Sequence, residues 1–119
     1  MRLTYNEQIK AEFILKNLIQ SKTPISYSEF AYRLELTGHR KINRVLKWLE
    51  QITLDDVITR EPIRACMIFS KLTPGLPSPG YFDFCKEIGL FDWKNDPSEG
   101  QKFINSQQKA LFSMKKAYK

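Results

Sequence analysis

The stretch from Pro24 to Tyr81 constrains the fold more than any other part of the chain, because its local signals follow one another in a defined order. A serine-rich start can cap a short helix that carries Phe30 and Ala31 on one face. A Thr-Gly break follows, and a second amphipathic segment begins directly after it. This order predicts two helices joined by a turn, which we place at residues 26–52.

The second of these helices separates apolar from basic residues. Ile42, Val45 and Leu49 recur at helical spacing and predict the buried side. The basic side chains occupy other positions, and residues 38–50 hold four cations against one acid. A basic second helix in such a pair is typical of proteins that read the DNA major groove, although a solvated helix surface has a similar composition.

The remainder of the stretch predicts a small β-hairpin. Residues 63–69 are a continuous run of strand formers and indicate a buried strand. Three prolines and two glycines follow within residues 73–80, where no regular element is expected, so this segment should turn the chain back. Residues 63–81 are therefore interpreted as strand and wing, with a helix favoured from Phe82 onward. We expect residues 53–61 to form the connection that precedes the strand.

Amphipathic patterns outside this stretch predict one further helix at each end of the chain, over residues 5–21 and 98–116. The length of 119 residues and the 42% hydrophobic content suit a single domain spanning residues 1–119. The expected fold class is mainly α with a small β-hairpin. Its architecture would be a winged helix-turn-helix with extra N- and C-terminal helices.

Composition narrows the classes of function. The net charge is +6, and residues 101–119 add a second basic patch of five lysines with no acid, which favours a polyanionic partner. A solvated lysine-rich tail is the alternative for the last five residues. No basic leader with an apolar run opens the chain, and no apolar segment approaches bilayer length. We expect a cytoplasmic protein with no membrane association.

The sequence lacks the residues that catalysis or metal binding would need. The single histidine, His39, stands beside a basic run, and Cys66 and Cys85 match neither a redox pair nor a zinc ribbon. The segment 73–80 lacks the lysine and the following Ser or Thr of a phosphate-binding loop. The sequence therefore predicts a protein that is not an enzyme, with no catalytic residue, no metal and no cofactor.

The order of elements resembles the DNA-binding domain of the alkylguanine-DNA alkyltransferases and of the non-catalytic alkyltransferase-like proteins. Residues 25–31 are similar to the family element P-Y-G-E-V-A, and residues 38–49 to its Gly-led helix A-R-A-V-G-x-A-L. Residues 61–64 with the apolar run after them are similar to N-P-I-P-x-x-x-P-C-H-R. The resemblance covers about half of the chain and implies recognition of double-stranded DNA.

The same alignment removes the chemistry of the family. Phe69 and Ser70 stand where the family has its alkyl-accepting cysteine and the activating histidine, and Asn43 stands where it has the arginine that replaces a flipped base. The resemblance thus implies groove binding without alkyl transfer, unless Cys66 has taken over the role of acceptor.

From these arguments we expect a non-catalytic protein that binds double-stranded DNA through a basic recognition helix and a proline- and glycine-rich wing. The alternative is a small protein-protein interaction module, or an accessory subunit of a larger nucleic-acid-processing complex, anchored on its protein partner by Trp48, Tyr81, Phe82 or Trp93. The residues expected to contact DNA are Ser26, Tyr27, His39, Arg40, Lys41, Asn43, Arg44, Lys47, Lys71, Lys115 and Lys116.

Overall fold

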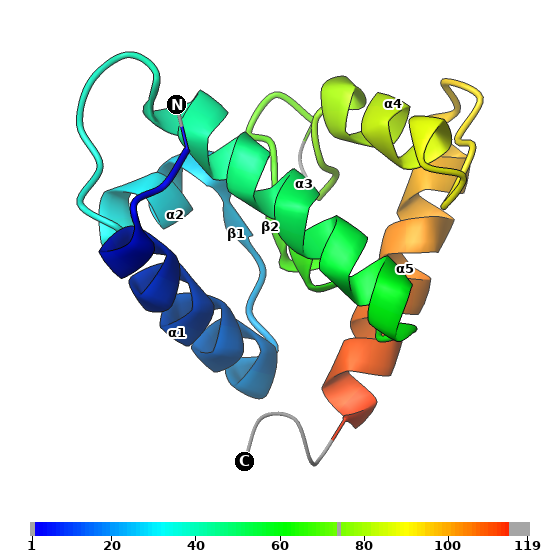
Figure 1. Ribbon diagram of the computed structural model, residues 1–119. Coiled ribbons are helices and arrows are strands. Elements are labelled where there is room, and N and C mark those ends of the chain that lie inside the picture. The colour runs from blue at the N-terminus through cyan, green and yellow to red at the C-terminus, as the bar shows by residue number, and fades with distance from the viewer. Residues whose placement is uncertain (1, 74, 115–119) are drawn as a thin grey trace.

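The computed structural model describes residues 2–73 and 75–114, and within them the chain is mainly helical, as expected (Figure 1). The elements in chain order are α1 (Tyr5–Ser21), β1 (Ile25–Ser26), α2 (Tyr27–Arg33), α3 (Lys41–Thr59), the 3-10 helix η1 (Arg64–Met67), β2 (Ile68–Phe69), α4 (Pro79–Glu87) and α5 (Pro97–Ser113). No helix in the described residues combines the length and the apolar character needed to cross a bilayer.

Most helices begin where a capping residue stands in the sequence. Thr4 and Glu7 form a reciprocal capping box at the start of α1, in which each side chain accepts a hydrogen bond from the backbone N–H of the other. Ser78 caps α4 and Asp96 caps α5, and in both cases a proline occupies the first turn. These local signals explain why the expected N-terminal helix over residues 5–21 is confirmed.

The two strands form a parallel pair, so the expected β-hairpin is wrong. Ile25 lies opposite Ile68, and Ser26 lies opposite Phe69. Most of the apolar run at 63–69 coils as η1, which leaves only two residues to extend along β1. The loop after β2 then leads into α4 instead of a return strand, because Ser78 and Pro79 start a helix there.

Helix α3 continues beyond residue 52, which was the expected end of the second helix of the pair. Ile52, Thr53 and Asp56 extend its buried side, and the helix ends only at Thr59, before Arg60 in a left-handed conformation. The buried Thr53 hydroxyl has hydrogen-bond partners inside the core. Its Oγ1 lies 2.7 Å from the Leu49 carbonyl oxygen and 2.8 Å from the Tyr81 hydroxyl. The predicted connection over 53–61 is therefore replaced by two more helical turns.

One buried cluster joins all the helices. The rings of Phe30 on α2 and Trp48 on α3 are stacked with centroids 5.8 Å apart, and Phe82 on α4 stacks on Trp93 at 4.7 Å. Trp48, Tyr81 and Phe82 are buried, and Trp93 is partly buried, so the first three do not offer the surface anchors that a protein-interaction module was expected to use. The core itself uses these aromatic side chains.

Helix α5 covers the end of this cluster with Ile104 and Leu111, while Lys102 and Lys109 are exposed as its amphipathic pattern predicts. Two glutamine side chains attach it to η1: Gln107 accepts a hydrogen bond from the backbone N–H of Ile63, and Gln108 donates one to the Cys66 carbonyl. The described helix begins at Pro97 and ends at Ser113, close to the expected range of 98–116.

Candidate nucleic-acid interface

Helices α2 and α3 pack against each other and are joined by a connection at residues 34–40, in which Leu34 and Leu36 are buried and residues 37–40 are exposed. The stacked pair of Phe30 and Trp48 fixes the two helices, and Gly38 turns the chain with a φ of +92°. In Figure 1 this connection bows outward from the body of the molecule. At seven residues it is longer than the turn of a compact helix-turn-helix, and it places the start of α3 at the edge of the protein.

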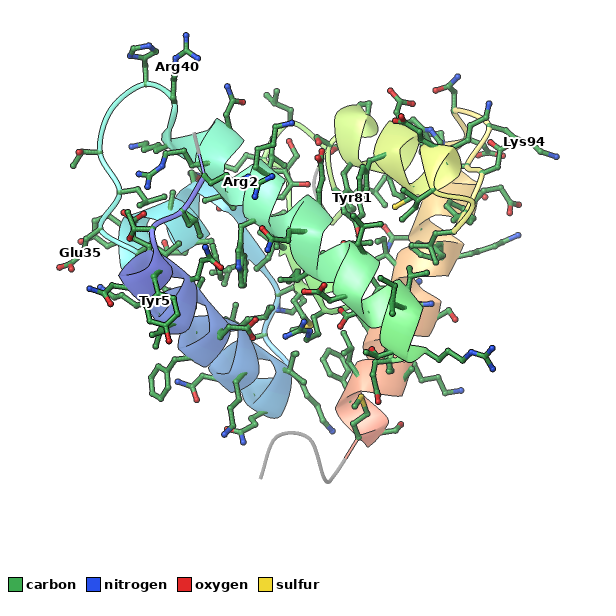
Figure 2. The ribbon with its side chains drawn as sticks, viewed as in Figure 1. Arg2, Tyr5, Glu35, Arg40, Tyr81 and Lys94 are labelled. Atoms are coloured by element: carbon green, nitrogen blue, oxygen red, sulfur yellow. The ribbon has the colours of Figure 1, made fainter. Side chains whose placement is uncertain are left out.

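The expected basic residues gather at this start. His39, Arg40, Lys41, Asn43 and Lys47 are all exposed, and Figure 2 shows Arg40 on the outward connection. Because α3 begins at Lys41, His39 and Arg40 precede the helix, with Arg40 at the N-cap position. The spacing of Asn43 and Lys47 places them on one side of α3, opposite the buried Val45 and Leu49.

Arg44 has a different environment from its basic neighbours. Its guanidinium forms an ion pair with Glu7 on α1 and donates hydrogen bonds of 3.3 and 3.4 Å to the Arg2 carbonyl. The Thr4 backbone N–H and the Arg44 charge hold the pKa of Glu7 below its usual value, although partial burial opposes them. Arg44 therefore ties α3 to the start of α1.

This tie brings Arg2, which the sequence analysis did not identify, to the flank of α3 (Figure 2). Arg2 and Lys47 line the same shallow hollow of about 370 Å³, together with Glu50, Gln51, Leu54 and Phe84. No pattern in the neighbouring sequence identifies Arg2 as part of this site. Arg2 precedes α1, and its hydrogen bond with α3 joins residues 42 positions apart.

Ser26 and Tyr27 are buried, so they do not present a surface to DNA as expected. The Ser26 hydroxyl caps α2 by accepting a hydrogen bond of 3.1 Å from the Glu29 backbone N–H. The Tyr27 hydroxyl accepts one of 2.9 Å from the Ser78 backbone N–H, and burial raises the pKa of Tyr27. Ser26 instead starts α2, and Tyr27 connects α2 to the loop before α4.

That loop, residues 70–78, carries the exposed pair Lys71 and Leu72, and Leu72 is 92% exposed. Its base is closed by a 2.8 Å hydrogen bond from the Ser70 backbone N–H to the Leu76 carbonyl. In Figure 1 the loop and the α2–α3 connection both extend toward the upper side of the molecule. Lys115 and Lys116, the remaining predicted contacts, lie outside the described residues.

The two thiols lie inside the core. Burial raises the pKa of Cys66 well above its ordinary value and raises that of Cys85 to about 12. Because the thiolate is the nucleophilic form of cysteine, neither residue is activated. At the two positions that the alignment assigned to the family's cysteine and histidine, Phe69 is half-buried and Ser70 is buried.

The described residues contain no group of three or more His, Cys, Asp or Glu side chains arranged to hold a metal ion. Comparison with known proteins adds no further assignment: no protein-family model, no curated protein and no solved structure matches this chain.

Proposed function

We propose that this chain is a non-catalytic, winged-helix-like protein that binds double-stranded DNA, with the first two turns of α3 in the major groove. The observation that carries the proposal is the exposed set of Arg40, Lys41, Asn43 and Lys47 at the end of a packed helix pair. An α-helix fits the major groove, where Arg and Lys donate to guanine and Asn pairs with adenine. These residue types supply base contacts and phosphate contacts from one short segment.

Lys47 is available to a polyanion at little electrostatic cost. The Lys47 side chain is 62% exposed, and its nearest acid, Glu50, lies 4.0 Å away. An exposed ion pair of this kind contributes little to stability, so replacing it by a phosphate contact costs little. Arg2 adds a further cation beside Lys47, whereas the ion pair between Arg44 and Glu7 supports the position of α3.

The loop at residues 70–78 is the proposed counterpart of the wing. Lys71 supplies a charge for a phosphate, and the neighbouring Leu72 supplies an exposed apolar side chain of the kind that inserts at base steps in the minor groove. The loop is anchored at both ends, by the Ser70–Leu76 hydrogen bond and by Tyr27 on Ser78. It can therefore hold these side chains in a defined position.

The distribution of charge supports this orientation. Residues 72–100 contain five acids and two lysines, and they include α4 and the segment that leads to α5. In Figure 1 these elements lie on the side of the molecule away from the α2–α3 connection. A polyanion is therefore attracted more strongly to the α2–α3 connection than to the segment before α5.

A recognition role without catalysis agrees with the state of the two cysteines. Their burial suppresses the thiolate, so neither can act as an alkyl acceptor without first being exposed. Recognition by a winged helix of the alkyltransferase-like type needs no such acceptor, and it remains our interpretation of the sequence resemblance.

A pair of charge-matched double variants tests the proposed interface. The slope of the logarithm of the duplex binding constant against the logarithm of salt concentration is negative, and each phosphate contact contributes about 0.9 to its magnitude. We expect Lys41→Ala/Lys47→Ala to reduce that magnitude by about 1.8 and to weaken the affinity at about 0.1 M salt roughly 60-fold. The control, Lys102→Ala/Lys109→Ala, removes the same charge from exposed positions of α5.

Fluorescence anisotropy with a labelled duplex measures both variants, and circular dichroism checks that each is folded. The control should keep nearly the wild-type slope. Equal losses in the two variants would show that only net charge matters and would overturn the assignment of α3 as the recognition helix.

A further inference from the structure

A hollow of about 480 Å³ lies at the start of α3, beside the proposed duplex site. Its lining comes from α1, the end of α2, the α2–α3 connection and the first residue of α3, and it includes Lys10, Tyr32, Arg33, Glu35, Leu36 and Lys41. Figure 2 shows Glu35 on the same outward connection as Arg40. The hollow and the duplex site therefore share Lys41.

The end of α2 gives this hollow a defined shape. The backbone N–H of Leu36 donates a hydrogen bond of 3.1 Å to the Ala31 carbonyl, and that of Glu35 donates one of 2.9 Å to the Tyr32 carbonyl. These two bonds form a Schellman motif, in which Glu35 takes the left-handed position with a φ of +60°. Leu36 is buried, so the turn that lines the hollow is anchored in the core.

Tyr32 supplies the hollow with an aromatic ring that the core does not use. Phe30, on the same helix, is fully buried against Trp48, whereas Tyr32 is 77% exposed. Unpaired nucleic-acid bases stack on exposed aromatic rings with little regard to sequence, because every base has a π-face. A base inside a duplex is already stacked on its neighbours. The ring therefore favours a base that has no pairing partner.

The charges around the ring suit the phosphate of such a nucleotide. Lys10 pairs with Glu35 at 2.9 Å, and both side chains are at least 42% exposed. Arg33 pairs with Glu29 at 3.0 Å in a similarly exposed position. Exposed pairs of this kind contribute little to stability, so a phosphate can replace either acid at little cost. The third cation, Lys41, is exposed and forms no ion pair with any residue that the structure describes.

We propose that this hollow binds an unpaired nucleotide at the end of a DNA duplex, with the base stacked on Tyr32 and its phosphate contacted by Lys10 and Lys41. The inference rests on the proposed function, since α3 must first place the duplex beside the hollow. It specifies the partner further: a duplex that continues as a single strand binds more tightly than a blunt duplex.

A free nucleotide carries the same base and phosphate, but it is the weaker ligand for this hollow. It loses its translational and rotational freedom on binding, whereas a single-stranded extension is held near the hollow by the duplex to which it is joined. Contacts that add several-fold to the affinity of a joined strand are too weak to retain a separate nucleotide. The hollow therefore recognises a strand extension and not a nucleotide cofactor.

Titrations with a blunt duplex, and with the same duplex carrying a short single-stranded thymidine extension at its 5′ or 3′ end, test the site. We expect one of the extended duplexes to bind at least about fivefold more tightly than the blunt one, because stacking of a base on an aromatic side chain contributes roughly 5- to 150-fold. Tyr32→Ala should abolish this difference and keep the affinity for the blunt duplex. The control, Tyr5→Ala, removes a ring of the same 77% exposure from α1 and should keep the difference.

The outcomes separate this inference from the proposed function. Equal binding of the extended and blunt duplexes, or equal effects of Tyr32→Ala and Tyr5→Ala, would overturn the nucleotide site while leaving duplex binding intact. Thymidine 5′-monophosphate that binds as tightly as the extended duplex would overturn the assignment to a strand. A blunt duplex that does not bind at all would contradict the proposed function, and this inference with it.

Discussion

Replacing Asp56 by alanine is expected to lower the free energy of unfolding by about 3–5 kcal/mol, because it removes the carboxylate from a largely buried ion pair. The Asp56 side chain is 5% exposed, and its carboxylate accepts hydrogen bonds of 3.0 Å from both the backbone N–H and the guanidinium of Arg64. Arg64 also reaches Glu12 at 2.8 Å. Arg64 thus joins η1 to α3 through Asp56 and to α1 through Glu12.

Chemical denaturation measures this effect, and the neighbouring residue provides the control. Asp55 is exposed on the same helical turn, so Asp55→Ala should change the stability by no more than about 0.5 kcal/mol. A loss below about 1 kcal/mol in Asp56→Ala would show that the carboxylate is not needed to hold η1 on α3.

Asp56 also makes part of the free energy of unfolding depend on pH. Burial raises the pKa of Asp56 above its usual value, in spite of the hydrogen bonds and charge of Arg64, so the folded state binds its proton more tightly than the unfolded state does. This component is greatest below the unfolded pKa and is lost as the pH rises through the folded pKa. Asp56→Asn should remove it, which a pH series of unfolding curves can measure.

Replacing Phe82 by alanine is expected to cost about 3–5 kcal/mol, since the cavity that it leaves lies in a tightly packed aromatic cluster. Phe82 is 1% exposed, stacks on Trp93 and has Phe91 at a centroid distance of 6.1 Å. A Cβ at Gly100 on α5 would lie only 3.0 Å from the Phe82 ring, so α5 packs directly against it.

Thermal and chemical unfolding test this variant against Tyr32→Ala, which removes a ring that is 77% exposed. The control should stay close to the wild type. Because Phe82 lies on α4, which follows the loop at residues 70–78, the variant should also loosen that loop and increase its proteolysis. A Phe82→Ala protein as stable as the control would contradict the packing described for α4 and α5.

The parts of the fold that follow from local signals were predictable from the sequence. The helix over residues 5–21 has a capping box at its start, and the apolar spacing of Val45 and Leu49 correctly identified the buried side of α3. The amphipathic pattern near the C-terminus likewise predicted a helix, and α5 has Ile104 and Leu111 in the core and Lys102 and Lys109 at the surface. In each case neighbours within two turns of helix carry the information.

The errors arise where distant contacts decide the structure. The run at 63–69 has strand-forming residues, yet Arg64 is held by Asp56 on α3, and most of the run coils as η1. The two residues that do extend pair with β1, which is more than 40 positions away along the chain. Propensity cannot specify such a partner, so a continuous strand and its hairpin were predicted incorrectly.

At the candidate site, too, local sequence identified some features, whereas distant contacts determine others. The sequence predicted Lys41, Asn43 and Lys47 as DNA contacts on the second helix of the pair, and these residues are exposed. Tyr27 and Arg44 have residue types suited to DNA, but Tyr27 is buried under the loop before α4, and Arg44 is paired with Glu7. Only the tertiary structure separates a cation available to DNA from one already used within the protein.

A salt series of duplex titrations with the wild-type chain tests the central claim most directly. We expect the logarithm of the binding constant to fall linearly with the logarithm of salt concentration, with a slope of about −0.9 for each phosphate neutralised. The cations proposed for the interface are Arg2, Arg40, Lys41, Lys47 and Lys71, and five phosphate contacts correspond to a slope of about −4.5. Saturable binding with a slope near that value is the result that we predict. Binding that is absent at low salt, or that is unaffected by salt, would contradict a DNA-binding role for this chain.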